Sequence, residues 1–268
     1  NLLTFSFFYA FSENFLLPIS HDEVVHGKGS MIEKMFGEYE MKFSSLKTFY
    51  AYMTAHPGKK LIFMGQEFAQ FNEWRYYEQL DWGLLDFEAH RQMKDFVKAL
   101  NHLYLSEPAL WQRDFSWDGF CWISGDDNEN SVISFMRKAK RKSDSVIVVC
   151  NFTPVEYPQY RVGVPFKRKY KLLLNSADSN FGGNGQKRKE IYTAEKKACD
   201  GYDYSIMDEN YLDNLLNEIS LDKEIDHNIE VDFSGFEKIV DAIGGVDVEL
   251  TGAEASWIGG VKTGMNRL

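Results

Sequence analysis

The chain has 268 residues, enough for two domains or for one large barrel. Forty acidic residues against thirty basic ones give a formal charge of −10, which disfavours nucleic acid and anionic membranes and favours neutral partners. No stretch approaches the ~20 apolar residues of a membrane span, and the first residues lack the basic flank of a signal peptide. Cys121, Cys150 and Cys199 are widely spaced and odd in number, which predicts no disulfide framework, no zinc site and a reducing, cytoplasmic setting.

The first hundred residues predict alternating strands and helices. An apolar run at 15–19 predicts a strand that ends where His21 and Asp22 begin. Helical spacing of apolar residues follows over 39–53, then a short apolar run at 61–64 predicts a buried parallel strand. A second helix is predicted over 93–104. This βα alternation is typical of a barrel or a doubly wound sheet, whose chemistry lies at the carboxyl ends of the strands.

After Pro108 the pattern changes to short apolar runs separated by polar turns. The runs at 120–123, 132–136 and 146–150 predict an antiparallel β domain from about Glu107 to Ile206. The basic run at 137–142 lies between two of these strands, which predicts a solvated hairpin tip rather than a polyanion site.

Two further segments carry weaker patterns. The glycine-rich stretch 181–185 lacks a strand-to-helix context, so it predicts a loop rather than a phosphate-binding turn. Beyond Met207, apolar spacing predicts an amphipathic helix over 211–219 and another over 236–243, followed by a strand at 246–250.

The most specific motif is the run Ser-His-Asp-Glu-Val-Val-His-Gly-Lys at residues 20–28. It resembles the seventh barrel strand of the glycogen branching enzymes, which are members of the α-amylase superfamily. The aromatic stretch 71–77 and the β segments 128–135 and 148–154 resemble the same family. The resemblance implies the C-terminal part of a (β/α)8 barrel in residues 1–104, about strands 7 and 8, followed by an antiparallel β-sandwich in 105–206.

The resemblance also implies roles for two residues. Asp22 matches the family's transition-state stabiliser, and His21 matches the neighbour that binds the sugar hydroxyls. The local sequence alone favours a structural role for Asp22, as a strand-end cap or a salt-bridge partner. His21 and His26 are five residues apart in a loop with glycine, a spacing that disfavours a metal site.

Four other residues are candidates for contact with substrate. Glu67 follows the second predicted strand and is expected at the same edge as Asp22, although a carboxylate there can instead brace a loop. Trp74, Tyr77 and Trp82 are candidates to stack on glucan rings, with packing against the barrel rim as the competing interpretation.

The segments that carry the superfamily's nucleophile and acid, like Arg-x-Asp-Ala-Val and Ala-Glu-Glu, do not occur in this sequence. Residues 231–236, 241–248 and 262–268 resemble a different family, the LytR-CpsA-Psr cell-wall phosphotransferases, so 207–268 is expected to be a short α/β fragment. The chain therefore looks like a partial branching enzyme joined to part of another protein. Residues 1–104 are expected to expose apolar surface, since two βα units cannot close a barrel.

The resemblance predicts a transferase that moves an α-1,4-glucan segment to a 6-hydroxyl by a retaining double displacement. Its expected partner is an α-glucan such as glycogen or amylose, and it needs no cofactor and no metal. This chain alone is expected to be inactive. The alternatives are a non-catalytic glucan-binding fragment, an α-glucan hydrolase and, from the tail only, a cell-wall glycopolymer phosphotransferase. The sequence does not predict the oligomeric state.

Overall fold

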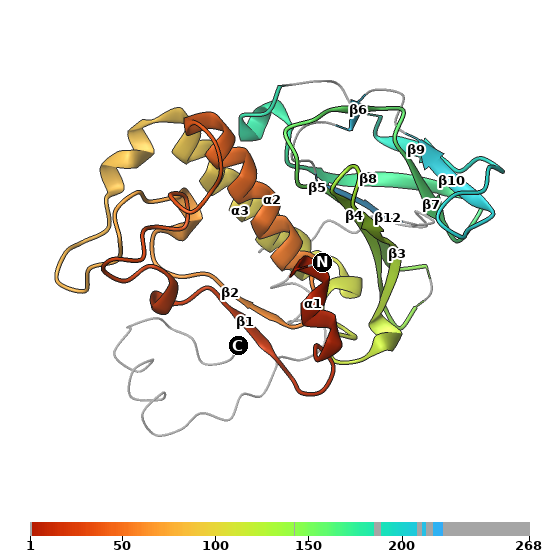
Figure 1. Cartoon of the computed structure of the whole chain (residues 1–268), viewed down its shortest axis with the longest axis horizontal. Coiled ribbons are helices and arrows are strands. Elements are labelled where there is room, and N and C mark those ends of the chain that lie inside the picture. The colour runs from red at the N-terminus through yellow and green to blue at the C-terminus, as the bar shows by residue number, and fades with distance from the viewer. Residues whose placement is uncertain (1, 142, 185–188, 208–210, 213–216, 222–268) are drawn as a thin grey trace, which may run out of the picture. The chain divides into compact units, whose positions relative to one another are not determined.

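The computed structural model describes residues 2–141, 143–184, 189–207, 211–212 and 217–221. In this part of the chain an α/β portion is followed by an all-β portion (Figure 1). The helix and strand predicted between 236 and 250 lie outside the described residues.

The α/β portion is built on two short parallel strands. Strand β1 (Leu16–Pro18) pairs with β2 (Lys59–Leu61) in parallel register. Helix α2 (Tyr39–Ala55) joins them, because parallel neighbours need a crossover that returns the chain to the same end. The short helix α1 (Leu2–Phe5) precedes β1, and α3 (Glu88–Ser106) follows β2. The predicted order of strand and helix from residue 15 to 104 is confirmed.

Helix α3 buries the face that its sequence predicts, and α2 is buried more widely. On α3 the buried side chains recur at helical spacing and pack against α2: Met93, Phe96, Val97, Leu100 and Leu103. Helix α2 also contacts β5 of the all-β portion, so its second half is buried nearly all round. A single apolar cluster therefore runs from the helices into the β sheet.

The parallel strands are less buried than predicted. The strand expected at 61–64 covers Lys59–Leu61 instead, and its burial is only partial. Leu16 and Met64 are both about half exposed. A two-stranded sheet buries its residues less than a wide parallel sheet does, because each strand has a single paired edge. The expected exposed apolar surface is thus present in the α/β portion.

The all-β portion contains a six-stranded antiparallel sheet with the order β3-β4-β5-β12-β8-β9. Its strands are β3 (Phe120–Asp127), β4 (Val132–Lys138), β5 (Ser145–Asn151), β8 (Lys169–Asn175), β9 (Ile191–Thr193) and β12 (Asn217–Leu221). Two antiparallel pairs complete it, β7 (Arg161–Val164) with β10 (Tyr204–Met207) and β6 (Tyr157–Pro158) with β11 (Tyr211–Leu212). The predicted antiparallel β domain is confirmed.

Both faces of this sheet are covered. On β4 and β5, Phe135 and Val148 belong to the apolar cluster shared with the helices. Their neighbours Met136 and Val149 point the other way, into a second cluster that includes Val162 of β7. The alternation follows from the two-residue period of a strand. It places the helices against one face and the β7–β10 pair against the other.

The amphipathic helix predicted over 211–219 is wrong. Residues 211–212 form β11, and 217–221 form β12, which pairs antiparallel with β5 on one side and β8 on the other. Backbone pairing on two edges outweighs a short helical pattern, since a strand between two others satisfies its N–H and C=O groups in both directions. The sheet consequently extends beyond the boundary expected at residue 206.

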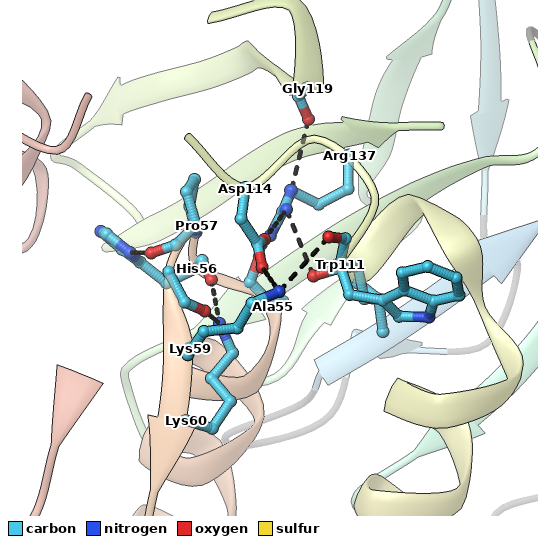
Figure 2. Close-up of polar contacts among 11 residues, drawn as sticks. Ala55, His56, Pro57, Lys59, Lys60, Trp111, Asp114, Gly119 and Arg137 are labelled. Atoms are coloured by element: carbon cyan, nitrogen blue, oxygen red, sulfur yellow. Dashed lines mark hydrogen bonds and ion pairs between the residues drawn. The ribbon is translucent and has the colours of Figure 1, made fainter. Parts of the chain in front are cut away.

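The prediction that residues 137–142 form a solvated hairpin tip is also wrong for its first residue, Arg137. Arg137 lies in β4 and is fully buried, with its guanidinium 2.6 Å from the Asp114 carboxylate (Figure 2). It also donates to the backbone oxygen of Ala55 at 2.6 Å, at the end of α2. Lys59 of β2 binds the second Asp114 oxygen at 2.7 Å. The side chain is buried because this cluster neutralises and hydrogen-bonds it.

Candidate active site

His21 and Asp22 begin the loop that leaves β1. Residues His21–Glu23 form a single 3-10 turn, and the Ser20 hydroxyl accepts a hydrogen bond from the Asp22 backbone N–H at 3.4 Å. Both side chains are open to solvent, 52% exposed for His21 and 72% for Asp22. The His21 Nε2 lies 3.3 Å from an Asp22 carboxylate oxygen. The pair is therefore accessible to solvent, and its two polar groups are adjacent.

Two aromatic rings flank His21. The ring centroids of His21 and Trp74 are 5.9 Å apart, those of His21 and Phe63 are 6.1 Å apart, and Phe63 and Trp74 meet edge to face at 5.1 Å. Phe63 and Trp74 are half-buried and pack against the main apolar cluster. They come from the segment after β2, so the ends of both strands contribute to one site. Sequence reasoning singled out Trp74 but missed Phe63, which carries no motif.

The other two aromatic candidates lie farther along the same segment. Tyr77 is 67% exposed and contacts Tyr76 edge to face at 5.2 Å. Trp82 is half exposed, and its ring lies 5.2 Å from that of the buried Phe68. Tyr77 and Trp82 are therefore exposed side chains, whereas Trp74 packs against the main apolar cluster.

Glu67 lies in a 3-10 turn (Gln66–Phe68) after β2. Its side chain lines a hollow together with residues of α3, among them Lys94 and Lys98. Burial raises the pKa of the Tyr50 hydroxyl, and the nearby Glu67 charge adds to that rise. No described contact joins Glu67 to His21 or Asp22. Within the described residues, Trp74 thus lies next to His21 of the pair, and Glu67 has no contact with either residue of the pair.

Glu73 holds the loop that carries the pair. One of its carboxylate oxygens accepts a hydrogen bond from the Gly29 N–H at 2.7 Å, and the other lies 3.4 Å from His26 Nδ1. The N–H groups of Gly29 and then Gly27 lower the pKa of Glu73, which keeps it ionised. No spacing in the sequence predicts this contact, because 44 residues separate Glu73 from Gly29.

The two histidines of the loop do not converge. His26 faces Glu73, whereas His21 faces Asp22 and the two rings. Among the described residues, no group of three or more His, Cys, Asp or Glu side chains is placed to hold a metal ion. In that same part of the chain, no helix is both long and apolar enough to span a membrane.

Residues 122–207 match the all-beta C-terminal domain family of the α-amylases, and residues 180–258 match the LytR-CpsA-Psr family. A 1,4-alpha-glucan branching enzyme from Halothermothrix orenii is 52% identical over 206 residues, which cover 77% of this chain and 33% of that enzyme. One from Bacillus cereus is 52% identical over 188 residues, or 70% of this chain and 29% of that enzyme. The chain spans about a third of the length of these curated relatives.

A crystal structure of AmyP in complex with maltose is similar with a TM-score of 0.44 and 16% identity, over 68% of this chain and 35% of that one. The sequence matches are far closer than this structural one. They relate the chain, over most of its length, to the 1,4-alpha-glucan branching enzymes of the α-amylase superfamily.

Proposed function

We propose that this chain supplies part of the active site of a 1,4-alpha-glucan branching enzyme. The observation that carries the proposal is the accessible His21–Asp22 pair at the carboxyl end of β1, in a chain 52% identical to branching enzymes. Carboxyl ends of parallel strands are where barrel enzymes keep their chemistry. Residues 1–104 then form about strands 7 and 8 of a (β/α)8 barrel, and residues 105–206 support it.

The reaction is a double displacement with retention of configuration. A carboxylate attacks the anomeric carbon of an α-1,4 link while a carboxylic acid protonates the departing 4-oxygen, which leaves a covalent glucosyl ester. The 6-hydroxyl of an acceptor glucan then displaces the carboxylate, loses its proton to the same acid residue and forms the α-1,6 link. No motif in this sequence marks the nucleophile or the acid. Both groups are therefore proposed to come from residues outside this chain.

Asp22 and His21 bind the sugar ring and take no direct part in breaking the α-1,4 glycosidic bond. As the ring flattens toward an oxocarbenium ion, the Asp22 carboxylate stabilises the growing positive charge and holds a hydroxyl. His21 donates to a neighbouring hydroxyl. The edge-to-face contact with Trp74 restricts the imidazole, which fixes the direction of that hydrogen bond.

The partner is an α-glucan, such as glycogen or amylose. A pyranose has an apolar C–H face, which the open rings of Tyr77 and Trp82 can cover. Glu67 is proposed as a polar contact with the glucan, and Trp74 as an aromatic contact. The proposed setting is the cytoplasm, and the tail from 207 is proposed as a LytR-CpsA-Psr-like fragment.

The test compares two neighbouring carboxylates in an enzyme that contains these residues together with its nucleophile and acid. We expect Asp22→Asn to lower the rate of α-1,6 link formation on amylose by about 10²–10³-fold, as loss of a charge-stabilising group does. Glu23→Gln is the matched control, because Glu23 is exposed in the same turn and has no assigned role. Equal rates for both variants would refute the role of Asp22.

One observation favours a second candidate, a glucan-binding function without catalysis: Tyr77 and Trp82 are exposed aromatic side chains in the segment that follows Trp74. Electrophoresis of this chain in gels that contain glycogen tests binding directly. Retardation that is lost in the double variant Tyr77→Ala, Trp82→Ala supports glucan binding, and unretarded migration of the unmodified chain excludes it. A hydrolase is distinguished by new reducing ends without α-1,6 links.

A further inference from the structure

We propose that Glu73 is a positioning residue, which holds the loop from His21 to Gly29 in the conformation that presents Asp22. The inference rests on the proposed function of the His21–Asp22 pair. Glu73 does not contact the pair and has no part in the chemistry. Its effect on the pair passes through the loop backbone.

The first attachment is made by the Glu73 side chain. The hydrogen bond from Gly29 N–H is short, at 2.7 Å, and the Glu73 side chain is only 21% exposed. Gly27 and Gly29 both have positive φ angles, 82° and 74°, and the N–H groups of both residues act on the Glu73 carboxylate. A carboxylate in such a turn replaces the water that these donors would otherwise bind.

The second attachment is made by the next residue. The Trp74 N–H donates to the Val24 backbone oxygen at 2.9 Å, and Val24 is buried. The Trp74 ring at the same time contacts His21. Residues 73 and 74 therefore contact the loop at four places, His21, Val24, His26 and Gly29.

The loop transmits this restraint to Asp22 over a short distance. The Val24 N–H donates to the His21 backbone oxygen at 2.9 Å, which closes the 3-10 turn that contains Asp22. The Lys28 ammonium also donates to the Asp22 backbone oxygen at 2.5 Å. A shift of the Gly27–Gly29 turn would move Lys28 and disturb the backbone of Asp22. Catalytic groups lose effectiveness when they are displaced by as little as about 1 Å.

The experiment uses three variants of this chain. Glu73→Ala removes the acceptor of the Gly29 N–H, whereas Glu73→Gln keeps an amide oxygen that can accept it. Glu78→Ala is the control, because Glu78 is exposed five residues later and pairs with Arg75 at 3.2 Å. Hydrogen exchange at the Gly29 amide reports the loop, exchange at Phe96 in α3 reports global stability, and retardation in glycogen gels reports binding.

We expect Glu73→Ala to speed Gly29 exchange by about tenfold or more, with Phe96 unchanged, and to weaken retardation by glycogen. Glu73→Gln is expected to restore both measurements to near the unmodified values, and Glu78→Ala to change neither. A purely structural role would slow or speed exchange at Gly29 and Phe96 together.

The outcomes separate the two proposals. Faster Gly29 exchange in Glu73→Ala with unchanged retardation would overturn the positioning role and leave the proposed function standing. Unchanged exchange would overturn it as well, since the attachment would then be dispensable. Absence of retardation for the unmodified chain would exclude the glucan-binding candidate, and Gly29 exchange would then decide whether Glu73 holds the loop.

Discussion

Asp114 is the residue that neutralises the buried guanidinium of Arg137 in Figure 2. Both side chains are fully buried, and Asp114 also pairs with Lys59. We expect Asp114→Ala to lower the free energy of unfolding by about 3–5 kcal/mol, because it leaves a buried cation without its counter-charge. Urea unfolding measures this loss. Asp118→Ala, at an exposed site nearby, should stay within about 0.5 kcal/mol of the unmodified chain.

His56 makes stability depend on pH. Burial lowers its pKa from 6.5 to about 4, and its ring nitrogens lie 2.9 Å from the Ser6 hydroxyl and 2.7 Å from the Pro57 oxygen. Below pH 6.5 the unfolded chain binds a proton that the folded chain does not, so stability falls as the pH drops toward 4. The loss should reach at most about 3 kcal/mol.

The variant His56→Gln isolates this effect from the carboxylates that titrate in the same range. It should be less stable at pH 7 but lose less stability between pH 7 and pH 4.5. Parallel pH dependences for the two proteins, measured by urea unfolding, would mean that His56 is not kept neutral by the fold.

At the scale of elements, strand β12 joins the two halves of the six-stranded sheet. Glu218 lies opposite Val149 of β5 and Asn175 of β8. Proline at this position removes a backbone donor from a central strand, so Glu218→Pro should cost about 3 kcal/mol or more. Glu218→Ala, which keeps the N–H, should cost less than about 1 kcal/mol. Thermal unfolding followed by near-ultraviolet circular dichroism compares them, and equal melting temperatures would contradict the central place of β12.

For the molecule as a whole, net charge and apolar surface act against each other. The isoelectric point is near 5.2, and several large apolar side chains of the α/β portion are exposed, including Phe8, Met64 and Leu105. We expect self-association to be strongest near pH 5.2, where mutual repulsion vanishes, and weaker at pH 8. Static light scattering at equal protein concentration tests this, and the same apparent mass at both values would contradict it.

The sequence by itself determined the elements whose signals are local. Helices α2 and α3 have long apolar periodicities, and the runs that became β4 and β5 are rich in β-branched residues, so both were predicted within a few residues. The motif at 20–28 likewise indicated the branching-enzyme family that the relatives share. These local patterns predict the structure correctly because they do not depend on which distant residues pack against the segment.

Only the tertiary structure decided the features that depend on distant partners. Residues 217–221 became a strand because β5 and β8 offered two backbone edges, and Arg137 became buried because Asp114 and the end of α2 neutralise and bind it. Glu73 contacts Gly29 across 44 residues, and Phe63 contacts His21, and no spacing in the sequence predicts either contact. Backbone pairing, charge neutralisation and ring contacts are properties of pairs of residues, so no single segment of the sequence contains them.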